Sequence, residues 1–258
     1  MTMSHLLSID EATAQRVVDD MNTQGHAMLE GALSAEALAD LRDYVSSQAA
    51  NHGNQYFAYH GYQALEGSAL ATLGKSSAFI SSLARVHRLA TGTLPASRQV
   101  FPVLRCVQGG TGQRESNAFH YDATLITVLI PIFTPTEGEQ RGDLVMFPNL
   151  RTVRGSVLFN IIEKAVLQNK FSRRLLTWAI ERGWAKPTTL RIVPGNVYLF
   201  WGYRSLHANE PCSPQFCRAT ALMHYGDPHA GSLATRWILK LNQHRARKAV
   251  ARTKTTVS

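Results

Sequence analysis

The sequence predicts a mainly β protein, an antiparallel sandwich or barrel with flanking helices, on two observations. From about residue 99 onward, short runs rich in Val, Ile, Leu, Thr and Tyr alternate with Gly and Pro, as is typical of antiparallel strands. Before that position, apolar residues recur mainly at helical spacing. At 258 residues, of which 45% are hydrophobic and 17% charged, the chain is long enough for one well-buried core.

The first hundred residues predict helices around one short strand. Residues 12–21 suit a helix, and residues 25–31 suit a strand between glycines. Ser34 is placed to cap the N-terminus of a following helix. A further helix is predicted over residues 68–90 from the spacing of its apolar side chains. We expect these helices to brace a sheet.

The strands of that sheet are predicted in the second half of the chain. They are expected at residues 100–107, 123–133, 142–147, 189–192, 196–201 and 218–225. Pro131 and Pro194 lie where a proline would limit a central strand, because proline cannot donate a ladder hydrogen bond. The segments around these two prolines are therefore expected at sheet edges or strand ends.

A helical insertion interrupts the β pattern at about residues 155–184, where apolar residues fall at helical intervals beside Lys and Arg. Residues 151–191 hold nine Lys or Arg against two Glu, and residues 236–258 hold seven with no acid. The rest of the chain is slightly acidic, although the net charge is +9. The insertion is interpreted in three ways: a helix pair packed on the body, an interfacial helix on anionic lipid, or a lid over an anionic substrate.

One domain is predicted over residues 1–244, followed by a basic, mobile tail at residues 245–258. The N-terminus lacks the basic stretch and long apolar run of a secretory signal, and the apolar runs are too short to cross a bilayer. Cys106, Cys212 and Cys217 form no CxxC pair, so neither a disulfide framework nor a structural zinc site is expected. A cytoplasmic protein with reduced thiols is predicted.

Candidate metal ligands precede the apolar run at residues 123–133. His120 and Asp122 are two residues apart in an extended segment, so their side chains point to the same side. On its own, this pair is weak support for a metal site, since a chain with ten histidines contains such a spacing by chance fairly often. A second histidine, His207, follows the strand predicted at 196–201, and Arg218 stands eleven residues further on. Two imidazoles and one carboxylate make the facial triad that leaves coordination positions open on Fe(II).

The order and spacing of these residues resemble the Fe(II)/2-oxoglutarate-dependent oxygenase superfamily. The matching positions are His120, Asp122, His207, Arg218 and Thr220. Residues 25–42 also resemble the start of the phytanoyl-CoA dioxygenase-like and prolyl-hydroxylase-like branches. The resemblance implies a double-stranded β-helix, or jelly roll, with N-terminal helices. The helical insertion lengthens the interval between His120 and His207 and departs from the common pattern.

The same resemblance implies the cofactors and the role of each residue. Fe(II) would be held by His120, Asp122 and His207. 2-Oxoglutarate would chelate the iron, and O2 would take the remaining coordination position. Arg218 would grip the far carboxylate of 2-oxoglutarate, and Thr220 would donate a further hydrogen bond to it. Decarboxylation would yield an iron(IV)-oxo species that abstracts hydrogen from the substrate. Because the halogenase branch lacks the carboxylate that Asp122 supplies, hydroxylation is favoured, while desaturation, ring formation and demethylation stay open.

The predicted function is thus a hydroxylase that acts on a small-molecule or lipid-like substrate, an anionic one included. Two alternatives stay open: a same-fold oxygenase that modifies a protein or nucleic acid, and a non-catalytic metal-binding jelly roll at a membrane surface. Nucleic acid is disfavoured, since the DNA/RNA demethylase branch carries a second arginine six residues after the first, where this chain has His224. The basic insertion suggests peripheral contact with the inner face of the membrane. The oligomeric state is left open.

Further candidates to line a substrate pocket are less specific. Arg105, Arg114 and Trp201 are each as well explained by ordinary strand or loop structure as by a pocket. His229 and His244, like His224, have no ligand spacing that indicates a metal. The sequence therefore predicts the metal ligands more sharply than it predicts the pocket around them.

Overall fold

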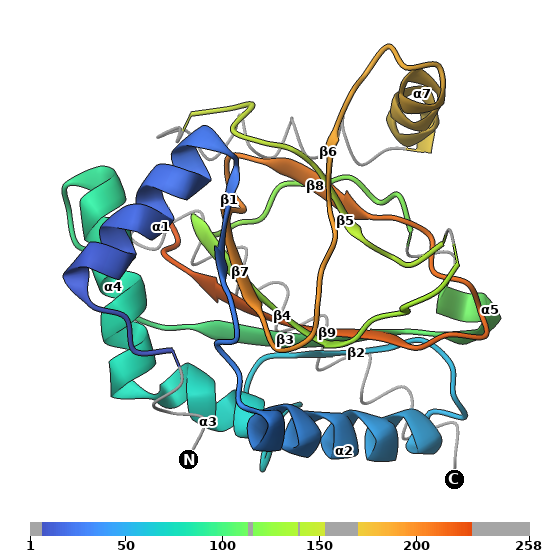
Figure 1. The fold of residues 1–258 in the computed structure, drawn as a ribbon, viewed down its shortest axis with the longest axis horizontal. Helices are drawn as coiled ribbons and strands as arrows, with labels where there is room; N and C mark the ends of the chain where they lie inside the picture. The colour runs from blue at the N-terminus through green and yellow to red at the C-terminus, as the bar shows by residue number, and fades with distance from the viewer. Residues whose placement is uncertain (1–6, 113–115, 139, 153–169, 229–258) are drawn as a thin grey trace, which may run out of the picture.

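The computed structural model describes residues 7–112, 116–138, 140–152 and 170–228 (Figure 1). The predicted tail at 245–258 and residues 153–169 of the predicted insertion lie outside the described residues, as do Arg114, His229 and His244. In the described part, a six-stranded and a three-stranded antiparallel sheet face one another, and helices lie against the outer face of the larger sheet.

The elements follow one another in two groups. The helices are α1 (Glu11–Thr23), α2 (Ala35–Asn51), α3 (Ala69–Lys75), α4 (Ser77–Thr91), α5 (Gly109–Gly112) and α7 (Lys170–Glu181). The strands are β1 (His26–Leu29), β2 (Phe57–His60), β3 (Phe101–Val107), β4 (Ile126–Phe133), β5 (Leu144–Phe147), β6 (Thr188–Leu190), β7 (Val197–Trp201), β8 (Leu206–Asn209) and β9 (Arg218–Tyr225).

The N-terminal helices begin at residues that cap them. The side chain of Asp10 accepts a hydrogen bond from the first turn of α1 at 2.7 Å, and that of Ser34 does the same for α2 at 3.2 Å. The prediction of one helix over residues 68–90 is wrong, because α3 and α4 are separate helices. Ser76 lies between them with an extended backbone (ψ 125°), and its hydroxyl caps α4.

The larger sheet has the strand order β1-β7-β4-β9-β3-β2. Successive side chains of a strand point to opposite faces, so each strand contributes one row to the helices and one row to the interior. The outer rows of β4 and β9 are apolar and form the main core with the helices: Ile126, Val128, Ile130, Ile132, Ala219, Ala221, Met223 and Tyr225. Helix α2 packs on β4, and α1 packs on β1 and β7 (Figure 1).

The smaller sheet has the order β6-β5-β8 and faces the inner rows of the larger one. A second apolar cluster lies between the sheets and is formed by Leu129, Leu144, Met146, Ile192, Tyr198 and Phe200. This cluster fills part of the space between the sheets with close-packed side chains. The remaining space is the cavity that holds the candidate site.

Two short strands were not predicted. β2 pairs with β3 at the edge of the larger sheet, and β8 pairs with β5 in the smaller one. The sequence placed His207 in a connection after a strand, whereas the structure has it inside β8. Strands of four residues are too short for their alternation of polar and apolar side chains to stand out from chance.

Pro131 lies in β4, which is a central strand in the order of the sheet. The ladder between β4 and β7 runs only from Ile126 to Leu129, whereas β4 and β9 remain paired past Pro131. The register between β4 and β9 also shifts between Pro131 and Phe133. At Pro131, β4 is therefore no longer paired with β7. The N–H that proline lacks removes no hydrogen bond to β7 there.

Helix α7 coincides with the second half of the predicted insertion. Ile180 and Leu176 pack toward the smaller sheet, whereas Trp184, next to the helix, is 72% exposed and stacks edge-on with Trp178 at 4.7 Å. Contact of this region with a lipid surface stays a prediction. Among the described residues, none of the helices combines the length and apolar character needed to cross a membrane.

Candidate metal centre

Backbone hydrogen bonds hold the two histidine-bearing segments side by side. His120 and His207 form an isolated antiparallel bridge in which each donates its N–H to the other's carbonyl, at 2.9 and 3.0 Å. Asp122 donates its N–H to the carbonyl of Gly202 at 2.9 Å. The segment at residues 120–122 is thus fixed to the chain around β7 and β8, which lies about 80 residues away in sequence.

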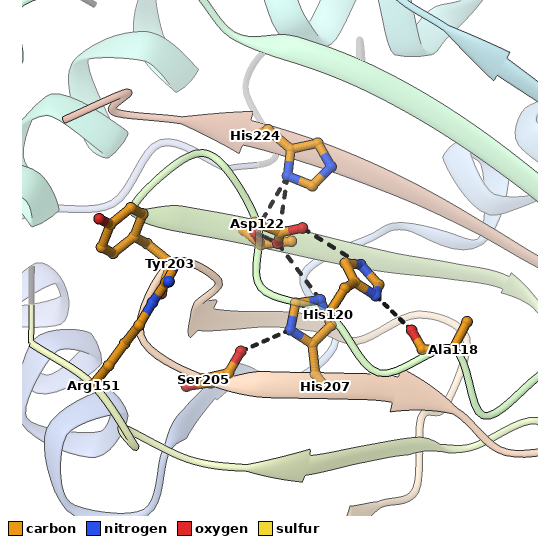
Figure 2. Close-up of polar contacts among 9 residues, drawn as sticks. Ala118, His120, Asp122, Arg151, Tyr203, Ser205, His207 and His224 are labelled. Atoms are coloured by element: carbon orange, nitrogen blue, oxygen red, sulfur yellow. Dashed lines mark hydrogen bonds and ion pairs between the residues drawn. The ribbon is translucent and has the colours of Figure 1, made fainter. Parts of the chain in front are cut away.

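The three side chains converge on one point (Figure 2). The Nε2 atom of His120 lies 3.7 Å from Oδ1 of Asp122, and the Nε2 atom of His207 lies 3.6 Å from Oδ2. One ligand atom from each residue lies within 4.8 Å of the other two. His120 and Asp122, two residues apart, and the distant His207 therefore form one group that can hold a metal ion, as the sequence predicted.

Both histidines present the same nitrogen to this point, because their other nitrogen is bound to the backbone. Nδ1 of His120 donates to the carbonyl of Ala118 at 2.8 Å, and Nδ1 of His207 donates to the carbonyl of Ser205 at 3.0 Å (Figure 2). A proton on Nδ1 leaves the Nε2 lone pair available in each ring. Such outer hydrogen bonds fix the tautomer and orientation of metal-binding histidines.

The protonation states also suit metal binding. Burial and the neighbouring His207 lower the pKa of His120 to about 4, so that its ring is neutral at pH 7. Burial alone would raise the pKa of Asp122, but the nearby His207, His224 and His120 outweigh it and hold that pKa below the usual range. At neutral pH the site therefore offers the neutral imidazole of His120 and the ionised carboxylate of Asp122 to a metal ion.

The carboxylate of Asp122 has two further neighbours that sequence reasoning missed. The hydroxyl of Thr127 donates to Oδ2 of Asp122. Nδ1 of His224 lies 3.7 Å from the same oxygen, as Figure 2 shows. A Cβ atom on Gly202 would lie 2.3 Å from this oxygen, so only glycine lets the backbone approach so closely. His224 and Arg218 are six residues apart on one predicted strand, so their side chains point to the same face. This was the signal that could have placed both in the site.

Replacing Thr127 with valine is expected to weaken metal binding about 10-fold to 100-fold, the range typical of lost outer hydrogen bonds. Valine keeps the shape but removes the hydroxyl that orients the Asp122 carboxylate. Titration of the apoprotein with Mn(II), followed by electron paramagnetic resonance of the free ion, measures the effect. Thr127→Ser keeps the hydroxyl and serves as the control. Equal affinity of the valine variant and the wild type would show that Thr127 does not orient the ligand.

A cation–π sandwich joins the two ligand-bearing segments. The guanidinium of Arg151 lies 3.9 Å from the ring centre of Tyr121 and 4.1 Å from that of Tyr203, and its Nε donates to the carbonyl of Tyr203. Tyr121 stands between His120 and Asp122, and Tyr203 lies in the connection that leads to β8 (Figure 2). Arg151 is 5% exposed, so these contacts are desolvated.

Replacing Arg151 with methionine is expected to lower metal affinity by about tenfold, within the range of outer-contact mutations. Lysine in its place should rescue little, since it lacks the planar group that stacks between two rings. Arg42→Met is the matched control, because Arg42 also lies over an aromatic ring, at 5.5 Å from Phe133, and also donates Nε to a backbone carbonyl. If both methionine variants lose thermal stability but bind Mn(II) equally well, Arg151 has a structural role alone.

Arg218 is 1% exposed and held by three contacts. Its Nε donates to the carbonyl of Gly142, its Nη1 to Thr220 at 3.3 Å and its Nη2 to Asn209 at 2.8 Å. These bonds use three of the five N–H groups of a guanidinium and leave one on each terminal nitrogen, the pair that a carboxylate can bridge. Burial and the nearby Arg105 lower the pKa of Arg218 to about 10, so it is charged at neutral pH.

A glycine permits this arrangement. Gly142 has a φ of +73°, and a Cβ atom there would lie 2.4 Å from Cδ of Arg218. Thr220 lies beside the guanidinium and accepts a hydrogen bond from it, so that its own O–H can still donate to a ligand.

The metal group and Arg218 line one cavity of about 900 Å³ between the two sheets. Arg105, a weak candidate from the sequence, also lines this cavity, as do Thr220 and His224. Trp201 does not: it is fully buried in the core under the helices, and its Nε1 donates to Asn22. Its place in a five-residue strand puts its side chain on the outer face, opposite to its neighbour Phe200, which lines the cavity.

Comparison with solved structures identifies the fold. A prolyl hydroxylase in complex with a hypoxia inducible factor oxygen degradation domain peptide from Trichoplax adhaerens is 16% identical, with a TM-score of 0.54 over 86% of this chain and 93% of that chain. The non-heme alpha ketoglutarate dependent epimerase SnoN from nogalamycin biosynthesis is 14% identical, with a TM-score of 0.52 over 83% and 82%. A prolyl 4-hydroxylase from Phytophthora capsici is 13% identical, with a TM-score of 0.51 over 87% and 68%.

No protein-family model matches the sequence, and neither does any curated protein sequence. The likeness in structure shows that the two facing sheets are a double-stranded β-helix, as the sequence predicted. The group of His120, Asp122 and His207 fits that fold.

Proposed function

We propose that this chain, which has the fold of the iron- and 2-oxoglutarate-dependent oxygenases, is itself such an oxygenase. The observation that carries the proposal is the pairing, in one cavity, of a His-Asp-His group with a buried arginine. His120, Asp122 and His207 would hold Fe(II), and Arg218 would bind the far carboxylate of 2-oxoglutarate. When bound, these groups together with O2 supply the oxidising chemistry that protein side chains lack.

The donor set fits Fe(II) rather than a structural metal. Two imidazole nitrogens and one carboxylate converge within 4.8 Å of one another, and all three residues line the cavity. This 2-His-1-carboxylate set with open positions is typical of non-haem Fe(II) oxygenases. Tetrahedral structural zinc sites close the fourth position with a further His or Cys instead. Among the described cysteines, none lines the cavity.

The chain's own residues would position the reactants. Arg218 and Thr220 lie at one end of the inner row of β9, and His224 lies six residues after Arg218, beside Asp122. Leu222, between Thr220 and His224 on this strand, adds apolar surface to the cavity lining. The metal group and Arg218 would together orient 2-oxoglutarate, which leaves the rest of the cavity for a substrate.

A small molecule is the substrate class that the cavity supports best. A volume of about 900 Å³ lies within the range of pockets that bury a whole small ligand. Hydroxylation is the outcome we propose, since Asp122 keeps the carboxylate in the site. The structural neighbour SnoN is an epimerase, so this fold also supports reactions other than hydroxylation. Identification of the product would distinguish hydroxylation from such a reaction.

A peptide substrate is the second candidate, since one structural neighbour is a prolyl hydroxylase in complex with a peptide fragment. Succinate formation from 2-oxoglutarate, measured with a set of small organic acids and with proline-containing peptides, separates the two. Stimulation by peptides alone would replace the small-molecule proposal. Stimulation by single-stranded nucleic acid would revive the alternative that position 224 disfavours.

The cofactor assignment is tested by adding Fe(II) and 2-oxoglutarate to the protein without oxygen. A weak visible charge-transfer band is expected in the wild type and is expected to vanish in His120→Ala. Glu66→Ala, which removes a surface carboxylate, serves as the control. If no band forms in the wild type, and 2-oxoglutarate is not consumed in air, the chain is a non-catalytic jelly roll and the proposal is wrong.

A further inference from the structure

Two thiols meet behind the strand that carries Arg218. The Sγ atoms of Cys106 and Cys217 lie 3.6 Å apart, although the residues are 111 positions apart in sequence, and both are free thiols. Cys106 is fully buried in the main core, and Cys217 is half-buried and packs against the same core. The two sulfurs therefore lie on the outer face of the larger sheet, whereas Arg218 lines the cavity on its inner face.

The backbone connects this pair of thiols to Arg218. Cys106 is paired with Phe57 of β2 on one side and with Ala219 of β9 on the other. Cys217 directly precedes Arg218, which is the first residue of β9. Since successive side chains of an extended chain point to opposite faces, Cys217 faces the core and Arg218 faces the cavity. A shift of the backbone at Cys217 therefore also moves Arg218.

Cys217 has more freedom to move than Cys106. Two ladders hold Cys106, whereas Cys217 lies outside β9 and follows a turn in which Phe216 donates its N–H to the carbonyl of Ser213 at 3.0 Å. A disulfide needs about 2.05 Å between its sulfurs, so the two Sγ atoms must approach one another by about 1.5 Å. Most of this movement is expected at Cys217, which would displace Arg218 from its hydrogen-bond partners.

The two thiols also differ in reactivity. The hydrogen bond with Cys106 lowers the pKa of Cys217, whereas the same hydrogen bond and burial raise the pKa of Cys106. The thiolate is the form of cysteine that reacts with an oxidant, and Cys217 is the more exposed of the two. Cys217 would therefore react first, and Cys106 lies where it can react with the product.

We propose that Cys106 and Cys217 are a modification site at which hydrogen peroxide forms a disulfide, and that this disulfide weakens the binding of 2-oxoglutarate to Arg218. The Cys217 thiolate attacks one peroxide oxygen, the O–O bond breaks, and the other oxygen leaves as water after protonation, which yields a sulfenic acid. The Cys106 sulfur then attacks the Cys217 sulfur, the S–O bond breaks, and the second oxygen leaves as water. The two thiols lose two electrons in all, and one peroxide is reduced to two waters.

Disulfide formation is tested on the metal-free full chain, because Fe(II) itself reacts with peroxide. Hydrogen peroxide is expected to remove two hydrogens from the intact mass and to join the tryptic peptides that span residues 106–114 and 205–218. Dithiothreitol should reverse both changes. Cys217→Ala, at the half-buried position, should prevent the link between the peptides. Addition of oxygen to the wild type without any link would show that no disulfide forms, and the proposal would be wrong.

Cys212→Ala is the matched control for this experiment. Cys212 is a third free thiol, and it lies on the same tryptic peptide as Cys217. The variant should form the link as the wild type does. If Cys212→Ala loses the link while Cys217→Ala retains it, the partner of Cys106 is Cys212, and the proposed site is wrong.

The effect on Arg218 is measured by calorimetric titration of 2-oxoglutarate into Mn(II)-loaded protein, after the peroxide has been removed. Oxidation of the wild type is expected to weaken 2-oxoglutarate binding by about tenfold, the loss typical of one hydrogen bond to a charged group. The affinity for Mn(II) should not change, because Arg218 is not among the converging metal ligands. Cys217→Ala treated in the same way should keep its affinity for 2-oxoglutarate.

The effect on 2-oxoglutarate rests on the proposed function, whereas the disulfide is detected by mass alone. If the reduced protein binds Mn(II) but not 2-oxoglutarate, the proposed function is wrong, and the effect on Arg218 is wrong with it. If 2-oxoglutarate binds equally well before and after the disulfide forms, the thiol pair does not act on Arg218, and the inference is overturned. Equal weakening by peroxide in Cys217→Ala would also overturn it, since the oxidation would then act elsewhere.

Discussion

Asp122→Ala is expected to reduce Fe(II) affinity by more than about 100-fold, beyond the effect typical of outer contacts, and to abolish consumption of 2-oxoglutarate. Asp122 supplies the charged ligand and is the residue that faces both histidines, at 3.6 and 3.7 Å. Without it, two imidazoles remain, and a divalent ion loses its only anionic protein ligand among the residues that converge there. Metal titration and succinate formation measure the two effects.

The fold of this variant should persist without metal. The nearby histidines hold the pKa of Asp122 below its usual range, so the ionised carboxylate stabilises the folded apoprotein at neutral pH and its removal costs stability. We expect the melting temperature of the apoprotein to fall by about 4 to 8 °C, which corresponds to roughly 2 kcal/mol, while the protein stays folded at 25 °C. Asp122→Asn keeps the shape without the charge and should bind metal almost as poorly as alanine. Full activity in the asparagine variant would refute the role of the charge.

Arg218→Lys is expected to raise the KM for 2-oxoglutarate by roughly 100-fold, because the loss of the two-pronged hydrogen bonding to the carboxylate costs about 2.7 kcal/mol. Lysine keeps the charge but cannot make the contacts to Gly142, Thr220 and Asn209 and still bridge a carboxylate. Metal affinity should change little, because Arg218 is not among the converging ligands. Steady-state kinetics at saturating Fe(II), with Mn(II) titration alongside, separate the two properties.

The matched control is Arg141→Lys, since Arg141 is also close to β5 and has a carboxylate partner, Asp143, at 3.6 Å, but lies outside the cavity lining. Its KM for 2-oxoglutarate should stay near the wild-type value. An unchanged KM in Arg218→Lys, or a loss of metal binding as severe as in Asp122→Ala, would contradict the assignment of Arg218 to the cofactor carboxylate.

Local signals were sufficient where the chemistry depends on neighbours in sequence. The two-residue interval between His120 and Asp122 dictates that both point to one side of an extended segment, and the structure has them so. Ser34 caps a helix because its hydroxyl reaches the first turn whatever surrounds it. The prediction of a single helix over residues 68–90 is wrong because of another local signal. The Ser76 hydroxyl caps α4, so a new helix begins there although the apolar spacing continues.

Contacts between distant segments were beyond these signals. Thr127 and Arg151 carry no motif, yet both lie against the ligand segments. The strand of Arg218 indicates the face on which His224 lies, but not that its neighbour is Asp122. Their places depend on strand pairing: β4 and β9 lie together in one register, which sets Thr127 opposite His224. Short range spacing cannot predict which strands pair, because pairing is decided by burial across the whole sheet.

By itself, the sequence determined the residue types of the site, their order and the class of fold, since donor chemistry and side-chain alternation are local properties. Tertiary structure alone decided that His207 lies within a strand bridged to His120, and that Arg105 shares a wall with Arg218. The reason is geometric. A β-sheet brings segments of about 100 residues' separation within hydrogen-bonding distance, and only its register determines which side chains meet in the cavity.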